Sequence, residues 1–216
     1  MDTGYHEDNY QNKITMAICY GMRILVLIAA GLFFLWGDWE SSVSTVIIFI
    51  LMLTPSFLKE RYRLHLPFAL EIGVVAFIFI TLFLGHLASF YDYIPFWDKF
   101  VHLQSGILLG ATGFIIIYIL NENKSAMLNL SPGFIAVFAI TFSLALGAVW
   151  EIVEFVGDSI FGSAWQASNT DTMWDLIADI IGSLIVSITG YFWMYRHKRL
   201  PFTPWFVRIF KTNKNK

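Results

Sequence analysis

The sequence predicts an all-α membrane protein, a polytopic bundle of about six transmembrane helices. The first observation is composition: 57% of the 216 residues are hydrophobic and 14% are charged. A soluble domain has about 45–50% apolar and about 25% charged residues. The second observation is that the apolar residues form long runs, and a helix needs about 20 such residues to cross a bilayer. The single cysteine, Cys19, lies inside one of these runs, so no intrachain disulfide is expected.

Six apolar segments are the candidate spans. They cover residues 14–36, 43–58, 68–90, 99–120, 134–157 and 175–195. The second segment is short and has Pro55 near its end, where a helix tends to stop or kink. An alternative with five spans places this segment in the membrane interface. The first segment is not expected to be a signal peptide, because the residues before it are acidic and its apolar run exceeds the usual core of about 7–15 residues.

The distribution of lysine and arginine predicts the orientation, since these residues accumulate on the cytoplasmic side. One set of loops holds nearly all the basic residues, and the opposite set holds only Lys99. We expect a cytoplasmic N-terminal segment (1–13), the helical bundle (14–195) and a basic cytoplasmic tail (196–216) in the plasma membrane. The tail either lies on anionic lipid or is simply solvated. The basic residues form no folded basic face, so nucleic-acid binding is not expected.

The fifth predicted span carries three carboxylates in the stretch GAVWEIVEFVGDSIFG, residues 147–162. Glu151, Glu154 and Asp158 follow one another at intervals of three and four residues, which places them within roughly 60° of one another on a helix. Ionisable residues at membrane depth usually face the bundle interior and mark a site. They cannot all ionise side by side without a counter-charge. Because Lys99 is the only basic residue in the loops on this side, we expect protons or a metal ion to balance them.

Two further spans bring acids and a histidine to the same level of the membrane. Asp98 and His102 are four residues apart at the start of the fourth span, and Asp171, Asp175 and Asp179 recur every four residues at the start of the sixth. Histidine with carboxylates is a ligand set for zinc, manganese or iron, whereas oxygen ligands alone suit magnesium or calcium. The sequence therefore predicts a divalent-metal site, with zinc, manganese or magnesium as the candidates, near the external face.

The predicted metal ligands come from three spans: Asp98, His102, Glu151, Asp158, Asp175 and Asp179. Glu154 is the candidate catalytic residue, as a general base that activates water. His86, at the external end of the third span, is a further candidate ligand.

Structural alternatives stand beside these assignments. The aspartates at the starts of the fourth and sixth spans are also suited to be helix N-caps. His102 is also suited to be a neutral histidine bonded to one neighbouring helix. Arg23 and Glu71 are expected to form a structural ion pair toward the cytoplasmic side. Glycines at three- and four-residue spacing, beginning at Gly106, predict close packing of the last three spans.

The pattern FWDKFVHLQSG, GAVWEIVEFVGDSIFG and DTMWDLIADIIGS resembles the YjdF-type integral membrane proteins of bacteria over residues 68–195. It is similar, more distantly, to the VanZ-like family, which has an Asp-Lys-x-x-His start, an acidic pair on a later helix and a closing helix with the pattern D-L-x-x-x-x-x-G. The arginine expected after the acidic pair of that family is missing here, so the glycopeptide-resistance phenotype is not carried over. The resemblance implies a membrane bundle whose acids form one site, and it implies no particular substrate.

Three functions follow from these expectations. The first is a metal-dependent hydrolase or transferase acting on a lipid or a lipid-linked envelope precursor. The second is a cation transporter, although no inverted repeat is apparent. The third is a non-catalytic membrane protein whose acids hold a structural ion or bind a partner.

Overall fold

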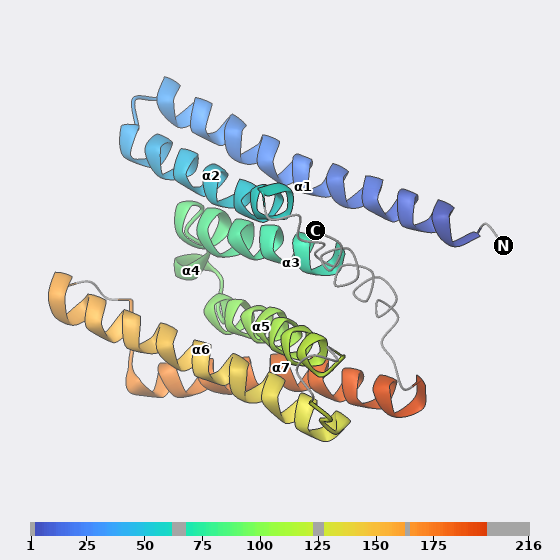
Figure 1. Ribbon diagram of the computed structural model, residues 1–216. Coiled ribbons are helices and arrows are strands. Elements are labelled where there is room, and N and C mark those ends of the chain that lie inside the picture. The colour runs from blue at the N-terminus through green and yellow to red at the C-terminus, as the bar shows by residue number, and fades with distance from the viewer. Residues whose placement is uncertain (1–2, 62–67, 123–127, 163–164, 198–216) are drawn as a thin grey trace. The chain divides into compact units, whose positions relative to one another are not determined.

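The chain is a set of helices in the computed structural model, which describes residues 3–61, 68–122, 128–162 and 165–197 (Figure 1). The described part of the chain contains no strand, so the predicted all-α class is confirmed. The elements in chain order are α1 (Thr3–Leu35), α2 (Trp39–Arg61), α3 (Phe68–Ile78), the π-helix η1 (Phe79–Leu87), α4 (Phe90–Tyr93), α5 (Trp97–Glu122), α6 (Pro132–Phe161) and α7 (Asn169–His197).

Six helical stretches are long and apolar enough to cross a membrane, with α3 and η1 together providing one of them. The six-span prediction is favoured over the alternative with five spans, because α2 is a 23-residue helix that contains Pro55 in its interior and is long and apolar enough to cross. The helix α1 begins at Thr3, whereas its candidate membrane-spanning part is Met16–Leu35. The separation of a cytoplasmic N-terminal segment from the bundle stays a prediction. Nearly all of the expected cytoplasmic tail, residues 198–216, lies outside the described residues.

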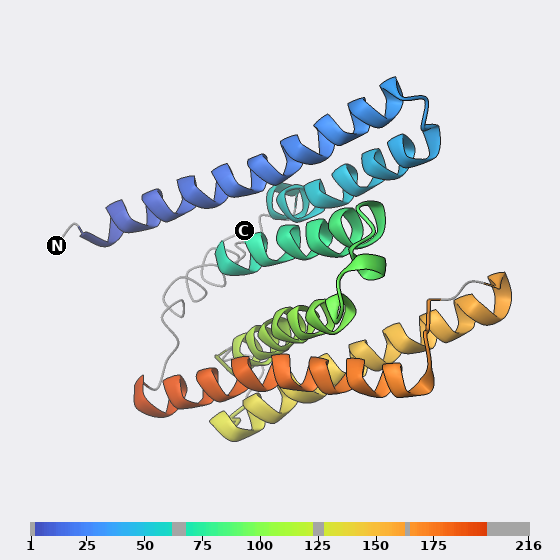
Figure 2. The ribbon, with the colours of Figure 1, turned by 180° about the vertical axis from the view of Figure 1, so that it is seen from behind.

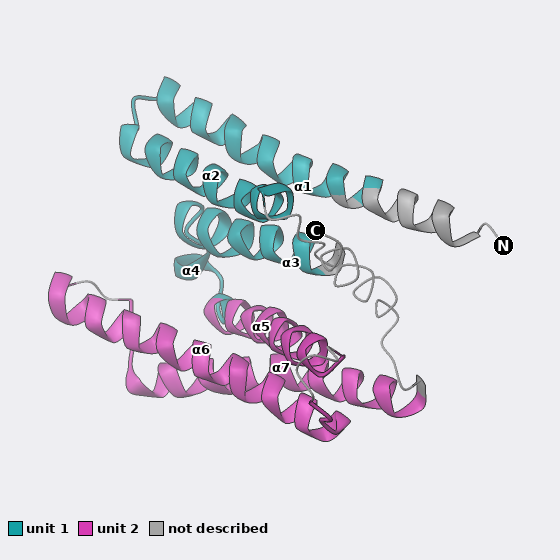
Figure 3. Cartoon of the chain, viewed as in Figure 1, with its two compact units in different colours: residues 1–97 teal, residues 98–216 magenta. Residues whose placement is uncertain are grey.

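The chain divides into two compact units, residues 1–97 and residues 98–216 (Figure 3). Unit 1 contains α1, α2, α3, η1 and α4, and it buries an apolar core. That core consists of Cys19, Val26, Ile48, Met52 and Val75.

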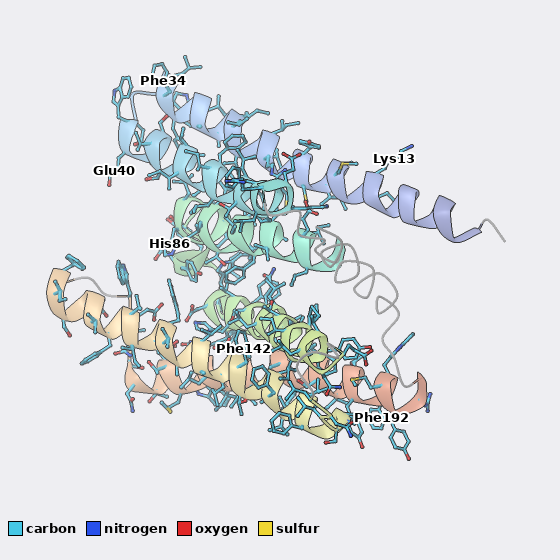
Figure 4. All side chains as sticks on the ribbon, viewed as in Figure 1. Lys13, Phe34, Glu40, His86, Phe142 and Phe192 are labelled. Atoms are coloured by element: carbon cyan, nitrogen blue, oxygen red, sulfur yellow. The ribbon has the colours of Figure 1, made fainter. Side chains whose placement is uncertain are left out.

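A tight turn joins α1 to α2, and Phe34 and Glu40 lie at this end of unit 1 (Figure 4). Asp38 caps α2, because its carboxylate accepts a hydrogen bond from the backbone N–H of Ser41 at 3.0 Å. Hydrogen bonds from Ser41 lower the pKa of Asp38, so this cap stays ionised at neutral pH.

Buried Arg23 donates its hydrogen bonds to residues of α2 rather than to Glu71. Its guanidinium donates to the carbonyl oxygen of Met52 at 2.6 Å and to Ser56 Oγ at 2.9 Å. Glu71 pairs with Lys59 at 2.7 Å, and Ser56 Oγ lies 3.4 Å from its other oxygen. The expected direct pair of Arg23 with Glu71 is therefore wrong, because Ser56 lies between the two charges and Lys59 reaches Glu71 from the last turn of α2.

Unit 2 consists of α5, α6 and α7, and Figure 2 shows it from behind. Close approach of these helices depends on glycine. A Cβ on Gly106 of α5 would collide with the backbone of Asp179 in α7, and one on Gly147 of α6 would collide with the carboxylate of that same aspartate. On α7, a Cβ at Gly182 would meet the backbone carbonyl of Leu103. The predicted close packing of the last three spans is confirmed.

The ends of α6 and α7 differ from the sequence-based boundaries. α6 continues to Phe161 and stops at Gly162, which has a φ of 64°, a left-handed conformation that glycine adopts without strain. α7 begins at Asn169, where Ser168 Oγ accepts from the backbone N–H of Asp171 at 3.1 Å. Because Ser168 provides this cap, Asp171 and Asp175 lie inside the helix.

The interpretation of these aspartates as N-caps is therefore wrong. It is wrong for Asp98 as well, since α5 already begins at Trp97. The carboxylates of these aspartates are therefore not needed to cap their own helices.

We predict that Gly106→Ala destabilises the protein, because the added methyl group meets rigid backbone of α7. Overpacking of this kind costs about 1–3 kcal/mol, so the melting temperature in mild detergent should fall. Gly21→Ala is the matched control, since a Cβ there has nothing within 4 Å and alanine is the better helix former. Equal melting temperatures for the two variants would contradict the close packing.

Candidate metal centre

Buried acids and one histidine gather where three helices of unit 2 meet. The N-terminal parts of α5 and α7 and the C-terminal part of α6 lie at the same end of this unit (Figures 1 and 2). Residues far apart in the chain therefore face one another. They are Asp98, Lys99, His102 and Ser105 from α5, Glu151 from α6, and Asp171, Asp175 and Asp179 from α7.

His102 is held in place by Asp179. The Nδ1 atom of the ring lies 3.3 Å from Asp179 Oδ2, and both side chains are buried. Ser105, three residues after the histidine, lies within hydrogen-bond distance of the other oxygen of Asp179. A carboxylate on one ring nitrogen fixes the orientation of a histidine and leaves the other nitrogen available as a ligand, as in metal sites.

The other ring nitrogen of His102 faces three carboxylates. Its Nε2 lies 3.6 Å from Glu151 Oε1, 3.9 Å from Asp98 Oδ1 and 4.0 Å from Asp175 Oδ1. These distances exceed the range of about 2.7–3.2 Å for a direct hydrogen bond. Two ligand atoms at about 2.1 Å from a metal in a tetrahedral arrangement lie about 3.4 Å apart. The observed separations of Nε2 from the three carboxylate oxygens are only a few tenths of an ångström longer. A shift of that size would bring these atoms to the spacing that a shared cation requires.

Glu151 is buried in a place where a positive partner would stabilise its carboxylate. Its side chain is 5% exposed, and neither carboxylate oxygen has a hydrogen-bond partner of good geometry in the described part of the chain. An unpaired carboxylate in such a place costs several kcal/mol. A proton or a metal ion would remove that cost, and the neighbouring His102 Nε2 supplies the second ligand type that a metal needs.

Lys99 corrects the expectation that only protons or metal balance these acids. Its ammonium lies 3.2 Å from Asp98, 2.5 Å from Asp171 and 2.7 Å from Asp175. In the sequence this lysine stands alone among the acidic loops, which is why protons or metal were expected instead. Its position three residues before His102, on the same face of a helix, is the sequence signal that could have placed it in the cluster.

Glu154 and Asp158 point to other partners, although they share a stripe with Glu151. Glu154 accepts a hydrogen bond from the indole of Trp150 at 2.9 Å on an exposed side of α6. Asp158 accepts from the backbone N–H groups of Trp165 and Gln166 at 2.8 and 2.9 Å. Asp158 therefore organises the start of the connection to α7, whereas Glu151 alone of the three approaches His102.

The remaining candidate, His86, belongs to unit 1. It lies near the end of η1, where its ring packs on Tyr91 with the centroids 4.8 Å apart. A role for His86 as a ligand stays a prediction. The group best suited to surround a metal consists of Asp98, His102 and Asp175, whose ligand atoms lie within 4.8 Å of one another, together with Glu151.

Comparison with known proteins identifies relatives of this chain. The profile of a family described as "Predicted membrane protein (DUF2238)" matches residues 17–196. A protein of Thermotoga maritima, named only as an uncharacterized protein, is 29% identical over 147 residues, which is 65% of this chain and 72% of that protein. No solved structure matches the chain. The matched residues include every member of the α5–α6–α7 cluster.

We predict that Asp158→Asn loosens the connection between α6 and α7. The amide side chain cannot accept both backbone hydrogen bonds as strongly as the carboxylate does. Hydrogen exchange at Trp165 and Gln166 should become faster, while exchange in the interior of α6 stays unchanged. Unchanged exchange at the two amides would show that the carboxylate does not hold this segment.

Proposed function

The chain belongs to the family described as "Predicted membrane protein (DUF2238)", and we propose that it is a membrane protein with one divalent-metal centre between α5, α6 and α7. The observation that carries this proposal is the pairing of His102 with Glu151. The imidazole is fixed through Nδ1, its Nε2 faces three carboxylates beyond hydrogen-bond distance, and the oxygens of Glu151 have no hydrogen-bond partner of good geometry in the described part of the chain. The proposed ligands are Asp98, His102, Glu151 and Asp175, with zinc, manganese or magnesium as the ion.

The proposal changes the roles of two predicted ligands. Asp179 becomes the residue that orients His102, since it lies on the opposite ring nitrogen. Asp158 becomes a structural residue of the connection, because backbone N–H groups occupy both of its oxygens.

The reaction we propose is hydrolysis or group transfer on a lipid or a lipid-linked substrate. When bound, a divalent ion supplies a Lewis acid that polarises an ester oxygen and makes water more acidic. Glu154, one turn of α6 from Glu151, is the proposed general base, and its present partner is the exposed Trp150. Apolar side chains of α6 near Glu154, including Ile152, Val153 and Phe155, are exposed, so a lipid has a lateral route to this face.

A second candidate function is structural. Lys99 already connects α5 to α7 through three carboxylates, and an ion beside it would add a further cross-link. In either case the distribution of basic residues supports a plasma-membrane protein with both termini in the cytoplasm and the centre near the external face. The relationship to YjdF-type and VanZ-like proteins stays a prediction.

We predict near-stoichiometric metal in the protein purified in mild detergent and loaded with zinc, manganese or magnesium. Glu151→Gln should lower the affinity by at least tenfold, and Asp179→Asn by about 10–100-fold, because it removes the support of a ligand. Elemental analysis and calorimetric titration measure both effects. Asp158→Asn, on the same helix as Glu151, should retain the metal. Absence of bound metal in the wild type after loading would refute the metal centre.

We predict that Glu154→Gln separates the catalytic from the structural function. A general base contributes about 10²–10⁴-fold to a rate, so this variant should keep its metal and lose turnover of lipid esters or lipid phosphates presented in mixed micelles. Trp150→Phe, which removes only the hydrogen bond to Glu154, is the milder control. Equal turnover by wild type and Glu154→Gln would exclude this base. A chelator that lowers the melting temperature of a protein without turnover would favour the structural function.

A further inference from the structure

Lys99 occupies a position that a metal ion would otherwise suit. Three carboxylates from two helices surround its ammonium at 2.5–3.2 Å: those of Asp98, Asp171 and Asp175. The side chain of Asp175 is 3% exposed and that of Lys99 is 23% exposed, so much of this contact is shielded from water. Two helices begin here, α5 and α7, and the positive N-terminal end of a helix attracts negatively charged groups.

This position adjoins the one proposed for the metal, and the two share ligands. Asp98 directs Oδ1 toward His102 Nε2 at 3.9 Å and Oδ2 toward Lys99 Nζ at 3.2 Å. The Oδ1 atom of Asp175 faces both, at 4.0 Å from the imidazole nitrogen and 2.7 Å from the ammonium. Glu151 contacts the imidazole side, and Asp171 contacts the ammonium side. Two shared carboxylates with one further carboxylate on each side are the arrangement of a two-cation centre.

We propose that Lys99 is the second, tethered cation of such a centre, and that the first position takes the divalent ion of the proposed function, on which this inference rests. Two-metal sites hold their ions about 3.5–4 Å apart and use both to stabilise the oxygens of a reacting group. Here the ammonium replaces one ion. It keeps Asp98 and Asp175 in place, limits the wild type to one metal, and sets an N–H donor beside that metal for an oxyanion of the substrate.

The test is to remove the tethered cation and count metal ions. Lys99→Ala leaves Asp98, Asp171 and Asp175 without their ammonium, so this variant should bind two Mn²⁺ ions per chain where the wild type binds one. Elemental analysis after loading gives the count. Paramagnetic resonance gives the geometry, because two Mn²⁺ ions that share carboxylates are magnetically coupled and a single ion is not. Lys99→Arg should bind one ion, since it retains the charge.

Controls and outcomes separate this inference from the metal centre itself. Lys59→Ala removes a lysine whose partner is Glu71, and its count should equal that of the wild type. One ion in both wild type and Lys99→Ala would overturn the tethered-cation role and leave the metal centre intact. No ion in the wild type would refute the metal centre and this inference with it.

A folding defect in Lys99→Ala does not prevent the test. Breaking a buried charge pair commonly destabilises a protein, so the variant is prepared both with and without Mn²⁺ throughout purification. If an ion replaces the ammonium, Mn²⁺ should restore the melting temperature of Lys99→Ala and have no such effect on Lys59→Ala. Failure of Mn²⁺ to restore it would overturn the inference, because the position would then not accept a metal.

Discussion

The structure of unit 2 depends on the need to pair charges that lie between helices in a nonpolar environment. Carboxylates buried there are costly unless a positive group approaches them. Lys99 meets this need for Asp98, Asp171 and Asp175, and in doing so it connects the first turns of α5 and α7. Among the ion-pair contacts of the described residues, Glu151 makes none with this lysine, and only His102 Nε2, at 3.6 Å, approaches its carboxylate. The proposal of a metal centre rests on this local imbalance of charge rather than on the number of acids.

Helix packing determines which acidic side chain lies beside which partner. The backbones of α5 and α7 approach closely because Gly106 and Gly182 have no side chains, and this approach places Asp179 beside His102 and Ser105. Gly147 on α6 leaves room for the carboxylate of Asp179. The histidine is therefore oriented by a residue that is itself confined on three sides. Such confinement limits the movement of the imidazole, as the proposed role of His102 as a ligand requires.

The sequence was sufficient for the fold and for the location of the buried cluster of acids around His102. Long apolar runs specify the spans because the bilayer fixes their length, and the alternation of loops brings α5, α6 and α7 to a common level. The orientation of single side chains was not predictable. Glu151 and Glu154 differ by only about 60° around α6, and the packing of α7 decides that the first is buried and the second meets Trp150. Lys99 reaches α7 through a long flexible side chain, which residue spacing does not reveal.

The ion pairs of Lys99 also bear on how the protein enters the membrane. Placing an aspartate in the middle of a lone helix costs about 2.5–3.5 kcal/mol during insertion, and α7 carries three of them in its first half. Synthesis proceeds from the N-terminus, so α5 and its lysine precede α7 by about seventy residues. The ammonium is thus already at the membrane when Asp171 and Asp175 arrive. The last helix therefore packs against a helix that already carries its counter-charge, instead of inserting alone. The order of the helices in the chain thus lowers the free energy that is needed to insert the polar face of α7.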